Sequence, residues 1–291
     1  PMTTKGILRH IFRHPLKSAL GESLERTDIA ETGVDGDRAY ALIDVATRKV
    51  VSAKRPKLWR SMLCIAASRM PDGEGVSITF PDGRVLDQRS DDFVATLSAF
   101  LGRDVELAEM RHSSMRLERA RPDEVAVEGL DADVTLDINA LAEATPGRGF
   151  QDFAPLHLIS MSTMRAIADS AGLEDLDMAR YRPNLVVEMQ DAQAFCEDGW
   201  LGREVTIGSV RLHVMQLTPR CAIPTLALGR GDHFRPEILQ AINKLNRVEV
   251  EGFGKLPCAG VYARVLKPGA VKIGDAVVVR SIEAAVRKAS P

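Results

Sequence analysis

The sequence predicts an α+β protein that is predominantly β, with two β-barrel-like domains, a few added helices and a cleft between the domains. Short apolar or alternating segments, separated by Gly, Asp and Pro, recur in both halves of the chain and are typical of strands. They do not alternate regularly with helices, which disfavours a doubly wound parallel sheet. Residues 111–149 are richer in charge, Gly and Pro. We therefore expect a first domain at residues 5–110 and a second at residues 111–285.

Length and composition exclude several classes of protein. The chain has 291 residues, enough to bury a sizeable core, and 45% of them are hydrophobic. Lys and Arg number 38 against 40 Asp and Glu, a net charge of -2, so no nucleic-acid partner is expected. No window approaches the ~18 apolar residues of a membrane span, so no membrane partner is expected either. The four cysteines form no C-x-x-C pair, and without a signal peptide we expect reduced thiols and a cytoplasmic location.

The first half is predicted to contain mostly strands. Segments 6–12, 24–29, 39–45 and 76–80 are short and apolar or alternating. Pro81-Asp82-Gly83 predicts a turn with a strand on either side, that is, a hairpin. One helix follows, capped by Ser90 or Asp91 and ended by Gly102. Its apolar stripe consists of Phe93, Leu97, Phe100 and Leu101.

The second half is predicted to mix strands with two helices. Residues 164–171 predict a helix closed by Gly172, and residues 184–188 predict a strand. Gly208-Ser209 predicts the two-residue turn of a hairpin between residues 205–207 and 210–217. Arg235-Pro236-Glu237 opens a further helix, because Pro at an early helical position loses no hydrogen bond. The closing strands are expected at residues 260–266 and 276–279.

Cys221 is the first candidate functional residue. It follows the end of a predicted strand and stands directly after Arg220. A neighbouring guanidinium favours the thiolate, which is the form that binds a metal or attacks sulfur. Soft sulfur suits a soft, high-valent metal centre or a persulfide better than it suits Mg²⁺ or Ca²⁺. The alternative is a buried structural cysteine, a common role for any single Cys.

Arg182 and Asn184 flank Pro183 just before a predicted strand. Pro disfavours helical backbone at the residue before it, so we expect Arg182 to be extended and to point to the same side as Asn184. A forked cation beside an amide suits a phosphate or the edge of a pterin. The alternative is an ordinary strand entry with a solvated arginine.

Two clusters in the first domain add further cations and a hydroxyl. Lys17 and Ser18 follow the first predicted strand, and an ammonium beside a hydroxyl can bind phosphate. The alternative is a solvated lysine in a turn. Arg38 follows Gly36-Asp37, where glycine lets the backbone approach a ligand, although the segment also fits a plain turn. Together with Cys221, these residues suit a cofactor that carries both a metal and a phosphate.

Several familiar signatures are absent from the sequence. It contains no Walker loop, no dinucleotide-binding fingerprint, no G-x-S-x-G elbow and no iron–sulfur cysteine run. The six histidines show no metal-binding spacing. A reduction catalysed by this chain would therefore need electrons from outside it.

In their order and spacing, the clusters resemble the MOSC family, named after the C-terminal domain of molybdenum-cofactor sulfurase, preceded by the β-barrel domain that often accompanies it. In the first domain the resemblance rests on His14-Pro15-Leu16-Lys17-Ser18, Gly21-Glu22-Ser23-Leu24 and Gly33-Val34-Asp35-Gly36-Asp37-Arg38. In the second it rests on Asp152-Phe153-Ala154-Pro155-Leu156 with Ser160, Tyr181-Arg182-Pro183-Asn184, Phe195-Cys196-Glu197-Asp198-Gly199-Trp200, Arg220-Cys221 and Gly260-Val261-Tyr262-Ala263.

The resemblance implies a molybdenum cofactor of the molybdopterin type, held in a cofactor cleft between the two domains, with Cys221 as the protein's ligand to molybdenum. The positions that resemble pterin and phosphate contacts in relatives are Lys17, Ser18, Arg38, Ser160, Arg182 and Asn184. Arg220 is expected to join them as a cofactor-binding residue. Pyridoxal phosphate binding is a further association at the level of the family.

The resemblance also implies a reaction. The expected function is that of a cytoplasmic molybdenum-dependent oxidoreductase that removes oxygen from small N-hydroxylated or N-oxide substrates. Its electrons would come from a separate electron-transfer protein or reductase. Two alternatives stay open: sulfur transfer through a persulfide on Cys221, as in a cofactor sulfurase, and a cofactor carrier without turnover.

Overall fold

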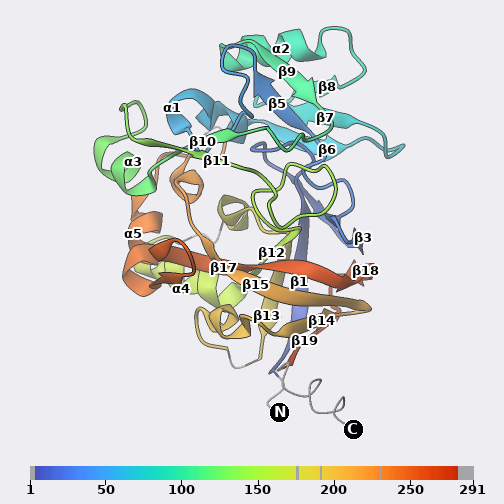
Figure 1. Cartoon of the computed structure of the whole chain (residues 1–291), viewed down its shortest axis with the longest axis vertical. Coiled ribbons are helices and arrows are strands. Elements are labelled where there is room, and N and C mark those ends of the chain that lie inside the picture. Colours follow the sequence, from blue (N-terminus) through green and yellow to red (C-terminus); the bar gives the residue numbers. More distant parts are fainter. Residues whose placement is uncertain (1–3, 175–176, 191, 230, 281–291) are drawn as a thin grey trace.

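The structure, a computed structural model, describes residues 4–174, 177–190, 192–229 and 231–280. Along its long axis, a first half with short sheets around α2 lies above a second half built on one large sheet (Figure 1). The mostly β architecture with two strand-rich halves and a few helices confirms the fold class expected from the sequence.

A seven-stranded barrel forms the second half. Its strands are adjacent in the order β12 (Leu156–Ser160), β13 (Leu185–Met189), β1 (Thr4–Arg13), β19 (Ala276–Arg280), β14 (Glu204–Ile207), β15 (Val210–Pro219) and β17 (Gly254–Lys267). Pairing of β17 with β12 closes the barrel, with Leu158 opposite Val261. All neighbouring pairs are antiparallel except β12 with β13. Closure leaves these strands without open edges, which makes a stiff support for a site.

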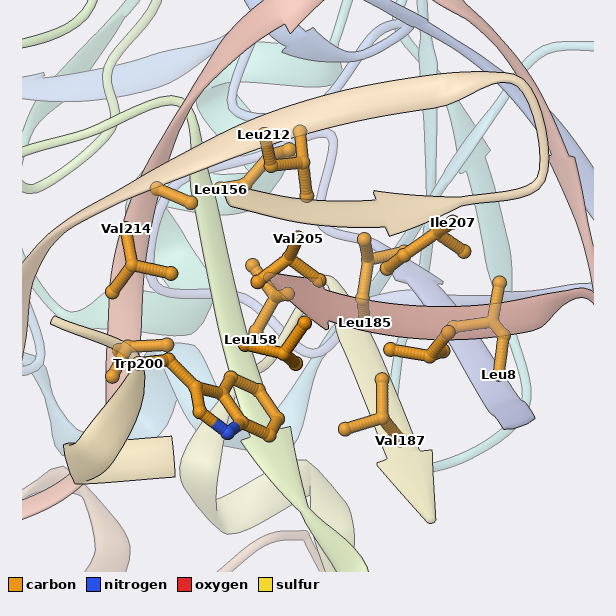
Figure 2. Close-up of a cluster of buried hydrophobic side chains, with 14 of the residues drawn as sticks. Leu8, Leu156, Leu158, Leu185, Val187, Trp200, Val205, Ile207, Leu212 and Val214 are labelled. Atoms are coloured by element: carbon orange, nitrogen blue, oxygen red, sulfur yellow. The ribbon is translucent and has the colours of Figure 1, made fainter. Parts of the chain in front are cut away.

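Alternate side chains of the barrel strands fill its interior, as Figure 2 shows. Leu8, Leu158, Val205 and Leu212 are each 0% exposed, and Trp200 packs beside them. Full burial of one such aliphatic side chain contributes ~1.5–3 kcal/mol. The packed core therefore fixes the barrel strands relative to one another.

The N-terminal strands join the two halves. β1 pairs with β13 and β19 inside the barrel, although it belongs to the first part of the sequence. β3 (Arg26–Ala30) pairs with β18 (Gly269–Lys272). Two short strands complete these contacts: β2 (Glu22–Leu24) beside β1, and β4 (Gly33–Val34) beside β3. Strands from the first part of the sequence are thus hydrogen-bonded to strands from the last part. The expected domain boundary between residues 110 and 111 stays a prediction.

The first half consists of two small sheets and short helices around a second core. Its elements are β5 (Ala41–Asp44), β6 (Ala66–Arg69), β7 (Val76–Thr79), β8 (Val85–Asp87), β9 (Val105–Ala108), α1 (Pro56–Trp59), η1 (Arg60–Cys64) and α2 (Phe93–Leu101). The predicted hairpin at residues 81–83 is confirmed as the turn between β7 and β8. Gly102 ends α2 in the left-handed region, as expected. The predicted helix cap was wrong, because the N-cap is Asp92, and the chain enters through a turn in which the Phe93 N–H donates to the Ser90 carbonyl.

Between the halves, β10 (Leu117–Ala120) pairs with β11 (Leu136–Asn139), and α3 (Pro122–Glu128) connects them. The remaining elements are α4 (Met161–Ala171), η2 (Met178–Tyr181), η3 (Cys196–Trp200), η4 (Ile223–Thr225), α5 (Pro236–Leu245) and β16 (Arg247–Val250). The hairpin with Gly208-Ser209, the helix closed by Gly172 and the helix opened by Pro236 are all confirmed. The strand expected at residues 24–29 is split into β2 and β3. Within the described ranges, no helix is long and apolar enough to cross a membrane.

Candidate functional site

A cavity of about 510 Å³ lies where the two halves meet. The first half contributes residues such as Arg38 and Lys54, the β10–β11 region contributes Arg119, and the barrel strands contribute His157 and Tyr262. The volume is within the ~300–1,000 Å³ that small-molecule sites occupy. Segments far apart in the sequence therefore build one site.

The cavity wall is rich in positive charge. It contains five cationic side chains and two carboxylates, those of Glu143 and Asp152. The cations are Arg38, Lys54, Arg119, Arg182 and Arg220. This excess of positive charge in a partly desolvated space favours an anionic ligand.

Several buried polar atoms of the wall lack a hydrogen-bond partner within the described part of the chain. They are Arg119 Nε, Gln151 Oε1, Thr218 Oγ1 and Arg220 Nε. A buried donor or acceptor without a partner costs ~1–3 kcal/mol, so most such groups in proteins are satisfied. Four of the eight such atoms in the described residues belong to this wall, so its side chains have hydrogen-bonding capacity left for a polar ligand.

Arg220 directly follows the end of β15 and is buried in the cavity wall. β15 ends at Pro219, and the Arg220 N–H then donates to the Pro257 carbonyl at 2.8 Å. Its Nη2 donates to the Tyr181 carbonyl at 2.9 Å, and its Nη1 lies 3.5 Å from His157 Nε2. Burial, Arg220 and Arg38 lower the pKa of His157 to about 3, so the imidazole is neutral at physiological pH. The Arg220 guanidinium therefore contacts a backbone carbonyl and a neutral imidazole.

Cys221 follows Arg220 and is half-buried in the cavity wall. All four cysteines are free thiols, and of these Cys221 alone lines the cavity. Burial raises the pKa of the Cys258 thiol to about 12, and burial with the Glu197 charge raises that of Cys196 to about 11. Cys221 is therefore the thiol placed to meet a ligand. Among the described residues, no group of three or more His, Cys, Asp or Glu side chains could hold a metal ion.

Arg182 and Asn184 both line the cavity, but the backbone of Arg182 differs from the prediction. It is left-handed, with φ 52 and ψ 45, so the extended conformation expected before Pro183 was wrong. The reason is that η2 ends here: the Arg182 N–H donates to the Ala179 carbonyl, and Nη1 donates to the Ala19 carbonyl at 2.6 Å. Burial and Arg38 lower the pKa of Arg182 to about 10, which leaves it charged at neutral pH.

Arg38 connects the halves at the cavity wall. Its Nη1 donates to Asp37 Oδ2 at 2.6 Å, and its Nη2 donates to the Arg182 carbonyl at 3.1 Å. Although burial opposes its charge, Asp37 raises the pKa of Arg38 above its ordinary value. The two arginines, 144 positions apart, are thereby held side by side as a paired positive region.

The other three sequence candidates lie outside the cavity wall. Lys17 is buried behind it, where its Nζ donates to the Phe150 carbonyl at 2.8 Å and to Asp152 Oδ1 at 2.6 Å. Ser18 Oγ accepts from the Ala53 N–H at 3.0 Å. Ser160 caps α4 and donates from Oγ to Glu197 Oε2 at 2.7 Å. Their roles as cofactor contacts stay predictions.

Sequence reasoning missed several residues of the wall. Lys54 and Arg119 carry no recognisable motif, and only their place in the fold brings them to the cavity. Asp152 and Tyr262 lie inside segments that carry the family resemblance. Their place in those segments is the sequence feature that could have identified them as site residues. Burial raises the pKa of the Tyr262 phenol, with a contribution from Asp152.

Comparison with known protein families agrees with this geometry. The model of the MOSC domain matches residues 146–278, and that of the MOSC N-terminal beta barrel domain matches residues 5–126. The chain belongs to the MOSC-domain family. Cys221, Arg182 and Arg220 lie in the part matched by the MOSC domain, and Arg38, Lys54 and Arg119 in the part matched by the N-terminal domain.

This MOSC protein is similar to curated proteins named mitochondrial amidoxime-reducing components. Component 1 from Danio rerio is 25% identical over 291 aligned residues, which cover 95% of this chain and 85% of the relative. Component 1 from Mus musculus is 30% identical over 122 residues, 38% of this chain and 35% of the relative. Component 2 from Homo sapiens is 30% identical over 131 residues, 44% of this chain and 38% of the relative. Against the mouse and human proteins, the matched region thus spans little more than a third of the relative's length.

Solved structures show weaker likeness. The YUAD protein from Bacillus subtilis has a TM-score of 0.45 and 12% identity, with 96% of this chain and 98% of that chain covered. YiiM from Geobacillus stearothermophilus has a TM-score of 0.30 and 12% identity, with 59% of this chain and 75% of that chain covered.

Proposed function

We propose that this MOSC protein binds a molybdenum cofactor of the molybdopterin type in the cavity and reduces small N-hydroxylated or N-oxide substrates. The observation that carries the proposal is the convergence of a half-buried thiol, five cations and four unpartnered buried polar atoms on one cavity. The relatives named for amidoxime reduction support this class of reaction. The cytoplasmic location expected from the sequence stays a prediction.

The residues of the wall fit the parts of such a cofactor. Arg38, Arg182 and Arg220 can bind its phosphate through charge-assisted hydrogen bonds. Cys221 offers the soft sulfur that a high-valent molybdenum centre favours. Gln151 Oε1 and Thr218 Oγ1, which lack partners, can pair with polar atoms of its heterocycle.

The chain's own part in the reaction is to bind the cofactor, to orient it and to shield it from water. When bound, the cofactor supplies the two-electron removal of oxygen from nitrogen, with the balance R–NHOH + 2 e⁻ + 2 H⁺ → R–NH₂ + H₂O. The arginines neutralise the phosphate, and the barrel holds Cys221 and Arg220 at the end of a strand. The sequence contains no nicotinamide or flavin fingerprint, so we propose that a separate electron-transfer protein or reductase delivers the electrons.

Activity measurements on protein purified from cells that make the cofactor test the proposal. Molybdenum and pterin content are measured first, then reduction of benzamidoxime with reduced viologen or with NADPH alone. Turnover is expected with viologen and not with NADPH alone. Cys221→Ser should lower turnover by ~100-fold or more, because a ligand to the reacting metal is replaced. Cys64→Ser, a half-buried thiol outside the cavity, is the matched control and should retain turnover.

Different outcomes separate the rival functions. Full activity of Cys221→Ser with normal molybdenum content would contradict the assignment of Cys221. Sulfane sulfur on Cys221 without reductase activity would favour sulfur transfer. Cofactor that binds and leaves readily, with no turnover toward a panel of N-hydroxy and N-oxide compounds, would favour a carrier.

A further inference from the structure

The carboxylate of Asp152 is an anomaly in a cavity dominated by cations. It is held from two sides by lysines of the first half: Lys17 Nζ lies 2.6 Å from Oδ1, and Lys54 Nζ lies 3.0 Å from Oδ2. The side chain of Asp152 is nevertheless 35% exposed and lines the cavity. Lys17, at 5% side-chain exposure, lies behind it. A site built only for anions has no use for a negative group at this place.

The two lysines fix both the charge and the direction of the carboxylate. Although burial opposes ionisation, Lys17 and Lys54 hold the pKa of Asp152 well below its usual range. Each ionised carboxylate oxygen accepts about two hydrogen bonds. Since each oxygen receives one ammonium, each retains one acceptor position. The result is a pair of adjacent acceptors on a side chain that lines the cavity.

The partner of such a pair is a group with two adjacent N–H donors. The arrangement is the reverse of a forked guanidinium that binds a carboxylate through two parallel hydrogen bonds. A phosphate is excluded here, because it would meet the carboxylate with like charge. A 2-amino-4-oxopyrimidine ring, the recognition edge of a pterin, presents the required donors, and so does an amidine.

We propose that Asp152, held by Lys17 and Lys54, binds the paired N–H edge of the cofactor's pterin and thereby sets the direction in which the cofactor lies. This inference rests on the proposed function and adds to it the orientation of the cofactor in the cavity. The pterin edge lies at Asp152, and the phosphate lies among the arginines that line the rest of the wall. An amidine group of the substrate is the second source of the same chemistry, and the experiment separates the two.

The first arm of the experiment changes the ligand and leaves the protein native. Cofactor-free protein is titrated with 6-hydroxymethylpterin, with its N2,N2-dimethyl analogue, with benzamidine and with pyrophosphate. The dimethyl analogue lacks the exocyclic N–H donors and should bind at least ~10-fold more weakly than the parent pterin, because a charged acceptor loses its partner. Equal affinity for the two pterins would overturn the proposal for the pterin edge. If the protein binds neither pterin nor pyrophosphate, the proposed cofactor site itself fails, which is a distinct result.

The second arm changes Asp152. Asp152→Asn should weaken binding of 6-hydroxymethylpterin by ~10- to 100-fold, since an acceptor is replaced by a donor. Pyrophosphate should bind as tightly as before or more tightly, because Lys17 and Lys54 lose their carboxylate partner. The matched control is Glu118→Gln, which removes a carboxylate that is likewise held by two cations, Lys49 and Arg55, but lies outside the cavity wall. This control should bind both ligands as the native protein does.

The outcomes of the second arm are distinct. Loss of benzamidine binding alone would assign the carboxylate to the substrate and overturn the pterin assignment. Unchanged binding of all ligands by Asp152→Asn would overturn the whole inference. If the variant loses every ligand, pyrophosphate included, the cavity has collapsed, and the comparison of the two pterins on native protein decides.

Discussion

Arg180 belongs to the short helix η2, and Arg220 donates to a carbonyl of the same helix. The two arginines are almost equally buried, yet their surroundings differ. Arg180 is 4% exposed, forms an ion pair with Asp232, and donates to the carbonyls of Pro224 at 3.2 Å and Leu226 at 2.8 Å. Arg220 is 6% exposed, donates to one carbonyl at 2.9 Å, and leaves its Nε without a partner. Among the described residues, Arg180 has an acidic partner and Arg220 has only neutral ones.

The contrast has an energetic basis. Removal of a charged side chain from water costs several kcal/mol, about as much as a good ion pair returns. The ion pair with Asp232 offsets this cost for Arg180. Within the described residues, Arg220 has no carboxylate within salt-bridge distance, and its neighbour His157 is neutral. We therefore expect the region around Arg180 to serve folding and the region around Arg220 to be stabilised by a bound anion.

The largest effect is expected from Arg180→Met. Removal of Arg180 deletes its ion pair with Asp232, which keeps Arg235 as its other cation, and leaves the Pro224 and Leu226 carbonyls without this donor. Together these losses should lower the free energy of unfolding by ~3–5 kcal/mol. Urea unfolding followed by circular dichroism measures the change. Where the variant is folded, its affinity for pyrophosphate should equal that of the native protein, since Arg180 does not line the cavity. A stable variant with weakened pyrophosphate binding would reverse the roles of the two regions.

A smaller effect, on binding rather than folding, is expected from Arg220→Met. Loss of one charge-assisted contact should weaken pyrophosphate binding by ~1.5–3 kcal/mol. Native protein should also gain thermal stability from the ligand, by ~2.7 kcal/mol at a concentration 100 times its dissociation constant. Isothermal titration and thermal unfolding measure both quantities. If Arg220→Met binds pyrophosphate normally and instead unfolds as readily as Arg180→Met, then Arg220 is a folding residue and the comparison fails.

Much of the fold could be predicted because its signals are local. The turn at residues 81–83 and the turn at Gly208-Ser209 give hairpins wherever they occur between strands. Gly102 and Gly172 end their helices because glycine enters the left-handed region without steric cost. The position of β1 inside the barrel of the other half is not local, and no property of residues 4–13 indicates it.

The site was predictable only in part, because its geometry depends on contacts between distant segments. Cys221, Arg220 and Asn184 could be singled out from short motifs, and the structure brings them to one cavity. Arg182 failed as a local prediction, since hydrogen bonds from η2 and to Ala19 outweigh the preference imposed by Pro183. The pairing of Lys17 with Asp152 spans 135 positions, so the sequence could not show that this ammonium is already engaged.

Lys17 is a third buried cation to compare with the two arginines. It has a carboxylate partner, Asp152, but its burial still disfavours the charged form. Burial lowers its pKa from 10.5 to about 8, although Asp152 acts in the opposite direction. Below pH 8 the folded and unfolded chains both carry the proton, whereas between pH 8 and 10.5 the unfolded chain binds a proton that the folded chain has lost.

Stability should therefore rise with pH across this window, by at most ~1.4 kcal/mol per pH unit from this one group. In Lys17→Met the group is absent, so the difference in unfolding free energy between native protein and variant should change by ~1–2 kcal/mol from pH 8 to pH 10. Urea unfolding of both proteins at the two pH values measures this difference. The subtraction cancels the contributions of tyrosines and other groups that titrate in both proteins. A difference that stays constant over this range would show that Lys17 keeps its proton in the folded state. Lys17 would then belong with Arg180, as a cation fully stabilised by its partner, and not between the two arginines.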